Sequence, residues 1–458
     1  MNEKKKTLTF VGAAAGLLLL ALITAPRRVT PTAFNDQGQP FFPDFKDPLA
    51  ATSLEVIDYD EATGSARPFK VQLKDGKWTI PSHHNYPADG KDRLAKTAAA
   101  VIDIRKDDFR SDNISDHEAC GVVDPLDEKA VSLKGRGKRV TLKGASEQVL
   151  ADFIIGKPVE GRDGFRFVRV PGQKRVYAVR MNIDISTKFS DWIESDLLQV
   201  NRDDIKQVVL RDYSIDERRG LVNQRDVLVL DKKDNDWVAN NMRSNEEVDK
   251  TKMNDFLTAL DGLSIVGVRL KPAGLSQSLE KASSGVMLSQ ADMLSLQSKG
   301  YYFTPSGQLL SNEGELQATT KDGVIYTLRF GEVVYGQGEA VTAGIDSLTN
   351  QPASGPGENR YLFITTSFDP KLLPPEPRKP RNTDFANKPD SLWTDADREN
   401  KRLQDEYDEW QKKMDKGRNL SNDLNARFAK WYYVISAASF DKLHLSRKDL
   451  VKPKSKTS

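Results

Sequence analysis

Two stretches of the chain repeat one order of hydrophobic and polar positions. The first alternates apolar and polar residues on two strands that meet at Asp75-Gly76, a pair typical of a hairpin turn. A helix follows, because apolar residues recur at intervals of three and four positions. The apolar positions are Phe69, Val71, Leu73, Trp78 and Ile80 on the strands and Leu94, Ala98, Val101 and Ile102 on the helix.

The second stretch has the same order. Its first strand ends in Asp212-Tyr213, where the earlier one ends in Asp58-Tyr59, and after an alternating strand and a polar turn Trp237 corresponds to Trp78. A helix begins at the same distance after each tryptophan. The buried stripe predicted for the second helix consists of Met253, Phe256, Leu257, Leu260 and Leu263.

Two further correspondences extend the repeat. The segment ACGVVDPLDEKAVSL, residues 119–133, is matched with PAGLSQSLEKASSGV, residues 272–286. Downstream of these segments, each half has a hairpin closed by a glycine, Gly156 in the first and Gly331 in the second. The sequence therefore indicates an internal duplication.

This duplication predicts an α+β fold class with two tandem related modules, residues 50–200 and 201–451, each an antiparallel sheet with helices. In the second module the closing strand and helix are missing at the expected place and reappear at Trp431–Leu450. Residues 368–427 are thus interpreted as an insertion in a hairpin loop, whose close ends keep the free energy of loop closure small. A smaller insertion is predicted at Leu288–Asn312.

The large insertion is rich in proline at its start and charged afterwards. Thr394 and Asp397 have the spacing of a helix capping box, and Gly417 and Asn419 are expected to end that helix. A shorter return helix would complete a helical hairpin. Either its apolar seam packs on the protein's own body or the hairpin docks another protein. The seam positions are Leu403, Tyr407, Trp410 and Met414 on the first helix and Leu420, Leu424, Phe428 and Trp431 on the second.

The N-terminus predicts a membrane anchor. Twenty residues without a charge lie between Lys6 and Arg27 and would form about 30 Å of helix, the thickness of the hydrocarbon layer. A cleaved signal peptide is the alternative, but Ile23 and Pro26 fit its cleavage site poorly. The lysines before the segment favour a cytoplasmic N-terminus, with most of the chain on the outer side. The predicted parts are an anchor at 1–28, a tether at 29–49 and a basic tail at 452–458.

Composition excludes some functions. The 68 basic and 66 acidic residues leave a net charge of +2, which argues against a dedicated nucleic-acid-binding protein. The single cysteine, Cys120, excludes a disulfide within the chain. With 38% hydrophobic residues the chain can still bury large cores without disulfides.

Histidine and cysteine supply the candidates for a metal site. His83 and His84 follow the Trp78 strand. His444 lies in the terminal amphipathic segment, where a surface or packing role is favoured over that of a base. The segment SDHEAC adds Asp116, His117, Glu118 and Cys120, but the spacing matches no recurring ligand pattern.

No other pattern assigns a reaction. The glycine-rich loop at 336–344 lacks the spacing and the lysine of a phosphate-binding loop, so a long hairpin loop is the preferred interpretation. Trp78 and Trp237 are expected to be core residues rather than ligand-stacking ones. We therefore assign no catalytic, cofactor-binding or metal-ligating residue, and predict no cofactor.

The hairpin containing Asp75, Gly76 and Trp78, the segments ACGVVDP and FIIGKPV, and the ending YYVISAASFDKLHLSRKDL resemble the DUF4340 family of bacterial envelope proteins. Two tandem copies would cover most of residues 50–450. The resemblance implies a single-pass protein of the cell inner membrane, with its bulk on the periplasmic side. It also implies an association with an ABC transporter of the gliding-motility auxiliary type, through permease and auxiliary subunits.

The predicted function is thus a non-enzymatic accessory or scaffold protein of the envelope. The predicted partners are membrane lipid, through the N-terminal helix, and transporter subunits, without nucleic acid. Two alternatives stay open. One is an anchored hydrolase whose site is assembled only in space, and the other is a module that binds glycan or lipid.

Overall fold

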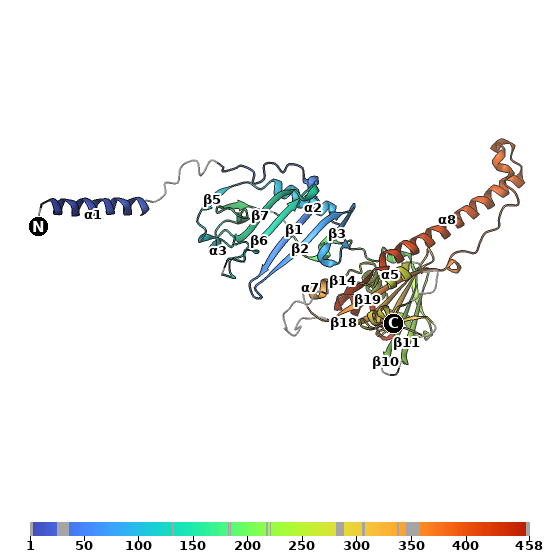
Figure 1. Cartoon of the computed structure of the whole chain (residues 1–458). Helices are drawn as coiled ribbons and strands as arrows, with labels where there is room; N and C mark the ends of the chain where they lie inside the picture. The colour runs from blue at the N-terminus through green and yellow to red at the C-terminus, as the bar shows by residue number, and fades with distance from the viewer. Residues whose placement is uncertain are drawn as a thin grey trace. The chain divides into compact units, whose positions relative to one another are not determined.

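A computed structural model describes residues 3–24, 36–130, 132–181, 183, 185–216, 219, 221–280, 288–304, 307–336, 339–344 and 358–454 (Figure 1). The chain forms two compact units. One consists of Met1–Arg67 and Ala95–Ile185, and the other of Pro68–Leu94 and Ser186–Ser458. Both are mixed α+β with antiparallel strands, as the sequence pattern predicts.

The first sheet has nine strands in the order β4-β3-β2-β1-β6-β7-β8-β9-β5. Alternation places apolar residues on one face, and Leu54 of β1 lies opposite Leu142 of β6, both fully buried. The predicted turn between β2 and β3 is confirmed, since Asp75 and Gly76 both have positive φ. The strands are β1 Ser53–Asp60, β2 Ser65–Lys74, β3 Lys77–Ile80, β4 Tyr86–Pro87, β5 Asp108–Ser111, β6 Lys138–Lys143, β7 Val149–Pro158, β8 Phe165–Arg169 and β9 Val176–Arg180.

The second sheet has eight strands in the order β12-β11-β10-β17-β18-β19-β20-β14. The terminal strand β20 lies between β19 and β14, because Arg360 pairs with Ile435 on one side and Gly267 pairs with Val434 on the other. The prediction that this distant segment closes the second sheet is confirmed. The strands are β10 Ile205–Asp216, β11 Leu221–Lys233, β12 Asp236–Ala239, β14 Gly267–Leu270, β17 Glu315–Thr320, β18 Val324–Val334, β19 Asn359–Phe368 and β20 Trp431–Ile435.

Eight strands of the first sheet correspond in order to the eight of the second. At one end of this match, β3, which carries Trp78, corresponds to β12, which carries Trp237. At the other end, β5 corresponds to β14, and each of these strands follows an amphipathic helix in the chain. Two short ribbons complete the second half. They pair β13 (Glu246–Val248) with β21 (Val451–Pro453), and β15 (Tyr301–Phe303) with β16 (Leu309–Ser311).

One predicted correspondence between the halves is wrong. A Cβ on Gly156 would lie 2.4 Å from the Cys120 carbonyl oxygen, and a Cβ on Gly331 would lie 2.2 Å from that of Lys299. The described chain that crosses the second glycine is therefore SKGYY, residues 298–302, where residues 272–286 were expected. Of the expected segment, residues 281–286 lie outside the described residues. The extra chain of the second half accordingly includes α5 (Ala273–Glu280), ahead of the insertion expected at Leu288–Asn312.

Both predicted amphipathic helices are confirmed. In α2 (Lys91–Ile102) the buried residues include Leu94, Ala98 and Val101. In α4 (Lys250–Asp261) the predicted stripe is buried, and Asp249 caps the helix by accepting from the amides of Thr251 and Lys252. Further α-helices among the described residues are α3 Asp116–Cys120, α6 Gln290–Gln297, α7 Glu339–Thr342, α9 Ala437–Leu443 and α10 Arg447–Leu450.

The N-terminal segment forms α1, Glu3–Thr24. Over the described ranges of the chain, a search for helices with the length and apolar character of a membrane span finds none. The anchor at 1–28 therefore remains a prediction from the sequence, and Arg27 and Arg28 lie outside those ranges.

The helical hairpin predicted within 368–427 is wrong. The chain forms one continuous helix, α8, from Asp395 to Ala429, and Gly417 lies inside it. A Cβ at Gly417 would lie 2.4 Å from the Asp322 carbonyl oxygen and 2.5 Å from a ring carbon of Phe368. The glycine thus allows the helix to pass close to the turn between β17 and β18 and to the end of β19, and does not end it.

Candidate functional site

The insertion forms an arm that extends from the second sheet (Figure 1). We define the arm as the proline-rich strap, residues 369–393, together with α8. The strap runs back along the helix. The Trp410 indole donates to the Pro374 carbonyl at 2.9 Å, whereas at the other end Lys388 pairs with Asp397 at 3.0 Å. The start of the strap therefore contacts the middle of α8, and the end of the strap contacts the start of α8, so the two segments run antiparallel.

The strap covers the apolar seam that the sequence indicated. Leu403, Tyr407, Trp410 and Met414 are all half-buried. The ammonium group of Lys379 on the strap lies 4.9 Å from the centre of the Tyr407 ring, within the range of a cation–π contact. The strap, which belongs to the same insertion, therefore packs on the seam where a return helix was expected.

The far end of the arm has a small core of its own. Phe385 is buried and meets Trp393 edge-on, with ring centres 5.9 Å apart, and the Trp393 indole donates to the Phe385 carbonyl. The predicted capping box is present, because Thr394 and Asp397 bond each other's backbone amides. The amide and hydroxyl of Thr394, with Lys388, lower the pKa of Asp397 to about 2.

Buried polar contacts fix the root of the arm on β19. The Asn425 side chain accepts from the Thr366 amide at 2.8 Å and donates to the Thr366 carbonyl at 2.7 Å. The Thr366 hydroxyl donates to the Ser421 carbonyl at 2.8 Å. Because such directional bonds form in only one register, they set the direction in which α8 leaves the sheet.

A buried lysine also contacts this root. Lys271 donates from Nζ to the carbonyl of Phe428, in the last turn of α8, at 3.0 Å. The same nitrogen lies 3.8 Å from the centre of the Phe363 ring. Burial holds the pKa of Lys271 well below its usual range. The lysine stabilises the helix end, where a donor to the last carbonyls is favourable.

The exposed face of the arm carries charges of both signs. Arg402 bonds Glu399 and Glu406, each at 2.6 Å, and Lys401 pairs with Asp405. Exposed ion pairs of this kind contribute little to stability, about 0 to 1 kcal/mol each. Their chemistry suits a polar protein surface, with which they can exchange partners.

His83 and His84 lie in the same unit as the arm. The His83 ring stacks on Phe189 with centres 4.4 Å apart, and its Nδ1 bonds the Ser82 hydroxyl at 2.9 Å. The His84 Nε2 lies 2.9 Å from the Ala343 carbonyl oxygen, at the end of the glycine-rich loop. Burial, and then the charges of His84 and Arg269, lower the pKa of His83 to about 4.

We expect His83→Phe to reduce the acid lability of the protein. A free histidine titrates near 6.5, so the unfolded state binds more protons between pH 6.5 and about 4, and stability falls as the pH drops through this window. The difference corresponds to about 3 kcal/mol at the acid end. Urea unfolding near pH 7 and near pH 4 measures it. If His83→Phe lost as much stability between pH 7 and pH 4 as the wild type does, this role of His83 would be contradicted.

The glycine-rich loop is a hairpin connection, as predicted. It joins β18 to β19, which pair in antiparallel register. Residues 337–338 of the loop, and residues 345–357 of the same connection, lie outside the described residues. Gly344 has a positive φ, and a Cβ there would meet the Arg269 side chain, so this end of the loop packs tightly on β14.

The segment SDHEAC forms α3, in the other unit. The Nε2 of His117 lies 2.8 Å from the Lys174 carbonyl oxygen, and Asp116 accepts from the Ser111 hydroxyl at 2.6 Å. Cys120 is buried, which raises the pKa of its thiol. Within the described part of the chain, a search for three or more histidine, cysteine or acidic side chains able to hold one metal ion finds none.

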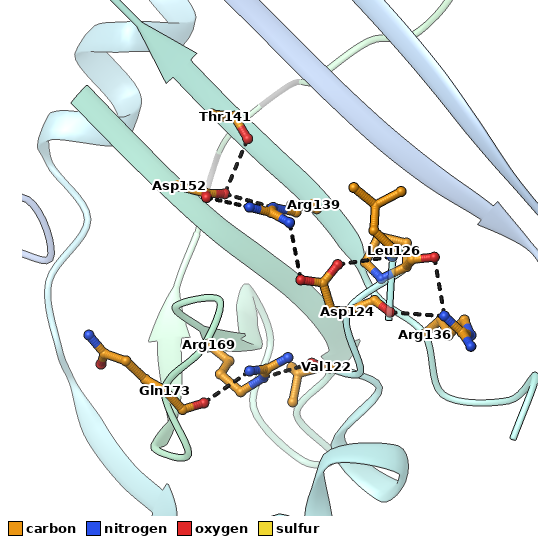
Figure 2. A network of polar contacts seen from close by, with 10 residues as sticks. Val122, Asp124, Leu126, Arg136, Arg139, Thr141, Asp152, Arg169 and Gln173 are labelled. Atoms are coloured by element: carbon orange, nitrogen blue, oxygen red, sulfur yellow. Dashed lines mark hydrogen bonds and ion pairs between the residues drawn. The ribbon is translucent and has the colours of Figure 1, made fainter. Parts of the chain in front are cut away.

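A polar network holds the chain that follows α3 (Figure 2). Arg139 binds both carboxylate oxygens of Asp152, at 3.0 and 2.7 Å, and reaches Asp124 at 3.1 Å. Arg136 donates to the carbonyls of Asp124 and Pro125, and Arg169 to that of Val122. These guanidinium groups bond to the protein itself, so the network has a structural role.

Two expectations about aromatic residues differ in outcome. Trp78 and Trp237 were predicted to be core residues, but both are only half-buried. Trp237 lies on the edge strand β12, and Trp78 lies on β3, next to the two-residue edge strand β4. His444 packs as expected. Its ring stacks on Phe440 with centres 4.7 Å apart, and burial lowers its pKa.

Sequence reasoning missed the network and the buried lysine. Alternation places Arg139 and Thr141 on one face of β6, where both bond Asp152 of β7, so paired polar positions on neighbouring strands were an available signal. Lys271 precedes a proline and lies outside any periodic pattern, so nothing in the sequence marked it as buried.

Comparisons with known proteins give one match. A family model described as a domain of unknown function (DUF4340) matches residues 78–278. Searches of curated proteins and of solved structures found no match. The matched range begins on β3 and ends in α5, so it includes parts of both sheets.

Proposed function

We propose, because the chain is a DUF4340 domain-containing protein, that it acts as a non-enzymatic, membrane-anchored accessory or scaffold protein of the bacterial cell envelope. Its two halves would be tandem copies of one module, held on the periplasmic side of the inner membrane by residues 1–28. Its partner would be an ABC transporter of the gliding-motility auxiliary type, and the arm would be the element that contacts it.

The arm is the observation that carries this proposal. It is fixed at its root by the Thr366–Asn425 bonds, sealed along its length by the strap and folded at its end around Phe385. A segment ordered before binding loses less conformational entropy in a complex than a flexible one. An extended, rigid and polar element suits the binding of another protein better than it suits catalysis.

The anchor has separate support. Most of the uncharged run lies within α1, Glu3–Thr24, and Leu17, Leu18, Leu19 and Leu20 are between 61% and 70% exposed. Exposing a cluster of leucines to water is unfavourable by about 25 cal/mol per Å² of apolar surface. A lipid environment would remove that cost.

We expect the full-length protein, purified from gently solubilised membranes of its own cells, to bring down an ABC permease and its ATPase. Reversing exposed arm charges with Arg398→Glu, Lys412→Glu and Lys413→Glu should reduce their recovery at least tenfold, since a like-charge contact replaces an attractive one. Quantitative mass spectrometry of the eluate measures the ratio of each subunit to the protein.

The control is Lys96→Glu, a charge reversal at an exposed position of α2. It should leave the recovery unchanged. All variants should melt at the wild-type temperature, because the reversed residues are exposed. Recovery of the wild-type protein alone, at stoichiometric yield, would refute the transporter partnership. Equal recovery with the arm variant would exclude the arm as the contact.

A further inference from the structure

A pocket of about 440 Å³ opens beside Trp237 in the second half of the chain. It lies between the β11–β12 hairpin and the first two turns of α4. Its volume falls within the range of small-molecule sites, about 300 to 1,000 Å³. The apolar part of its lining includes Trp237, Val248, Met253 and Leu257.

The polar lining of the pocket is balanced in charge. Four basic and four acidic side chains line it, together with the amides of Asn235 and Asn254. Some of the cations already bond to the protein. Lys250 pairs with Asp236 at 2.6 Å, and Lys232 donates to the Asp203 carbonyl at 3.4 Å. A bound anion or cation would thus meet like charges as well as opposite ones.

The two halves of the chain differ at this place. Gly90, just before α2, lies against Val71 and Trp78, since a Cβ there would lie 3.1 Å from a Val71 methyl carbon and 3.5 Å from the indole ring. The matching position before α4 is Asp249. Its carboxylate turns to the amides of Thr251 and Lys252, at 3.0 and 3.2 Å.

We propose that the Trp237 pocket binds a neutral carbohydrate, with one sugar ring stacked on the indole. The C–H face of a pyranose is apolar and flat and fits an aromatic ring, which combines apolar area with rigidity. Sugar hydroxyl groups both donate and accept, so they can bond carboxylates, ammonium groups and amides at one rim. A lipid tail would leave these charged groups desolvated without partners, which is costly.

Isothermal titration calorimetry with maltotriose and with N,N′,N″-triacetylchitotriose tests the proposal. The full-length protein is used in a detergent without a sugar headgroup. We expect saturable binding of at least one trisaccharide, weakened at least tenfold by Trp237→Ala. Asn254→Ala, at an exposed rim position, should weaken binding as well. Because an exposed substitution should leave folding intact, this variant tests the pocket even if Trp237→Ala misfolds. Trp78→Ala is the matched control from the other half and should bind as the wild type does.

Three outcomes would overturn the proposal. They are the absence of saturable binding for both trisaccharides, equal affinity in the wild type and in both pocket variants, and Trp237-dependent binding of dihexanoylphosphatidylcholine without any trisaccharide binding. None of them bears on the contact between the arm and a transporter, because the pocket residues and the arm residues are different.

Discussion

Gly417→Ala is expected to destabilise the arm, although alanine stabilises most helices. At an ordinary helix position this change adds about 0.5 to 1 kcal/mol of stability. Here the new methyl group would lie 2.4 Å from the Asp322 carbonyl oxygen and 2.5 Å from the Phe368 ring. Because the first of these atoms belongs to the backbone, the helix must move away from the β17–β18 turn. We expect a loss of about 3 kcal/mol, the upper range of overpacking effects.

Hydrogen exchange of the α8 amides measures this loss as a free energy of local opening. The control is Asn419→Ala, at an exposed position of the same helix. It should protect α8 slightly, because alanine has the higher helix propensity. If Gly417→Ala also increased protection, the close approach at the root would be refuted. The variant should weaken transporter recovery too if the arm is the contact.

Arg139→Leu is expected to have the largest effect on the first half of the chain. The change leaves Asp152 and Asp124 without their shared cation, while their side chains are only 21% and 18% exposed. Because these side chains are partly buried, we expect a loss of about 1 to 3 kcal/mol, the cost of leaving a desolvated polar group without its partner. The raised pKa of Arg139, caused first by its bond to Asp152, has the same origin.

Urea unfolding, followed by the hydrogen exchange of β6 and β7, measures this effect. Arg139→Lys should lose less, because it keeps the charge but not the two-point contact with Asp152. Combining Arg139→Leu with Asp152→Leu should recover part of the loss, because no unpaired carboxylate remains at that position. If the free energy of unfolding of Arg139→Leu alone lay within about 0.5 kcal/mol of the wild-type value, the network would be dispensable for stability.

The sequence predicted elements well where a local rule governs them. Asp75-Gly76 formed the expected turn, the two amphipathic helices buried their predicted stripes except for the half-buried Ile102, and Thr394 began α8 through its capping box. These features depend on backbone preferences and on the periodicity of neighbouring residues, both of which are written in the chain itself.

Prediction was wrong where a residue's role depends on a distant neighbour. Gly417 has the local character of a helix end, but it serves a contact with Asp322 and Phe368. The segment that crosses Gly331 was misassigned, because close approach of Lys299 leaves no periodic trace in the sequence. Trp237 has the pattern of a core position, yet it borders a pocket.

The chain alone predicted the strands and helices that recur in the two halves, because hydrophobic alternation and turn residues act within a few positions. Comparison of the two halves then placed the terminal strand in the second sheet. Tertiary structure decided that 395–429 is one helix, that the strap seals it, and that Arg139 unites two acidic residues. Those outcomes follow from packing between segments remote in sequence, where steric fit and desolvation outweigh local preference.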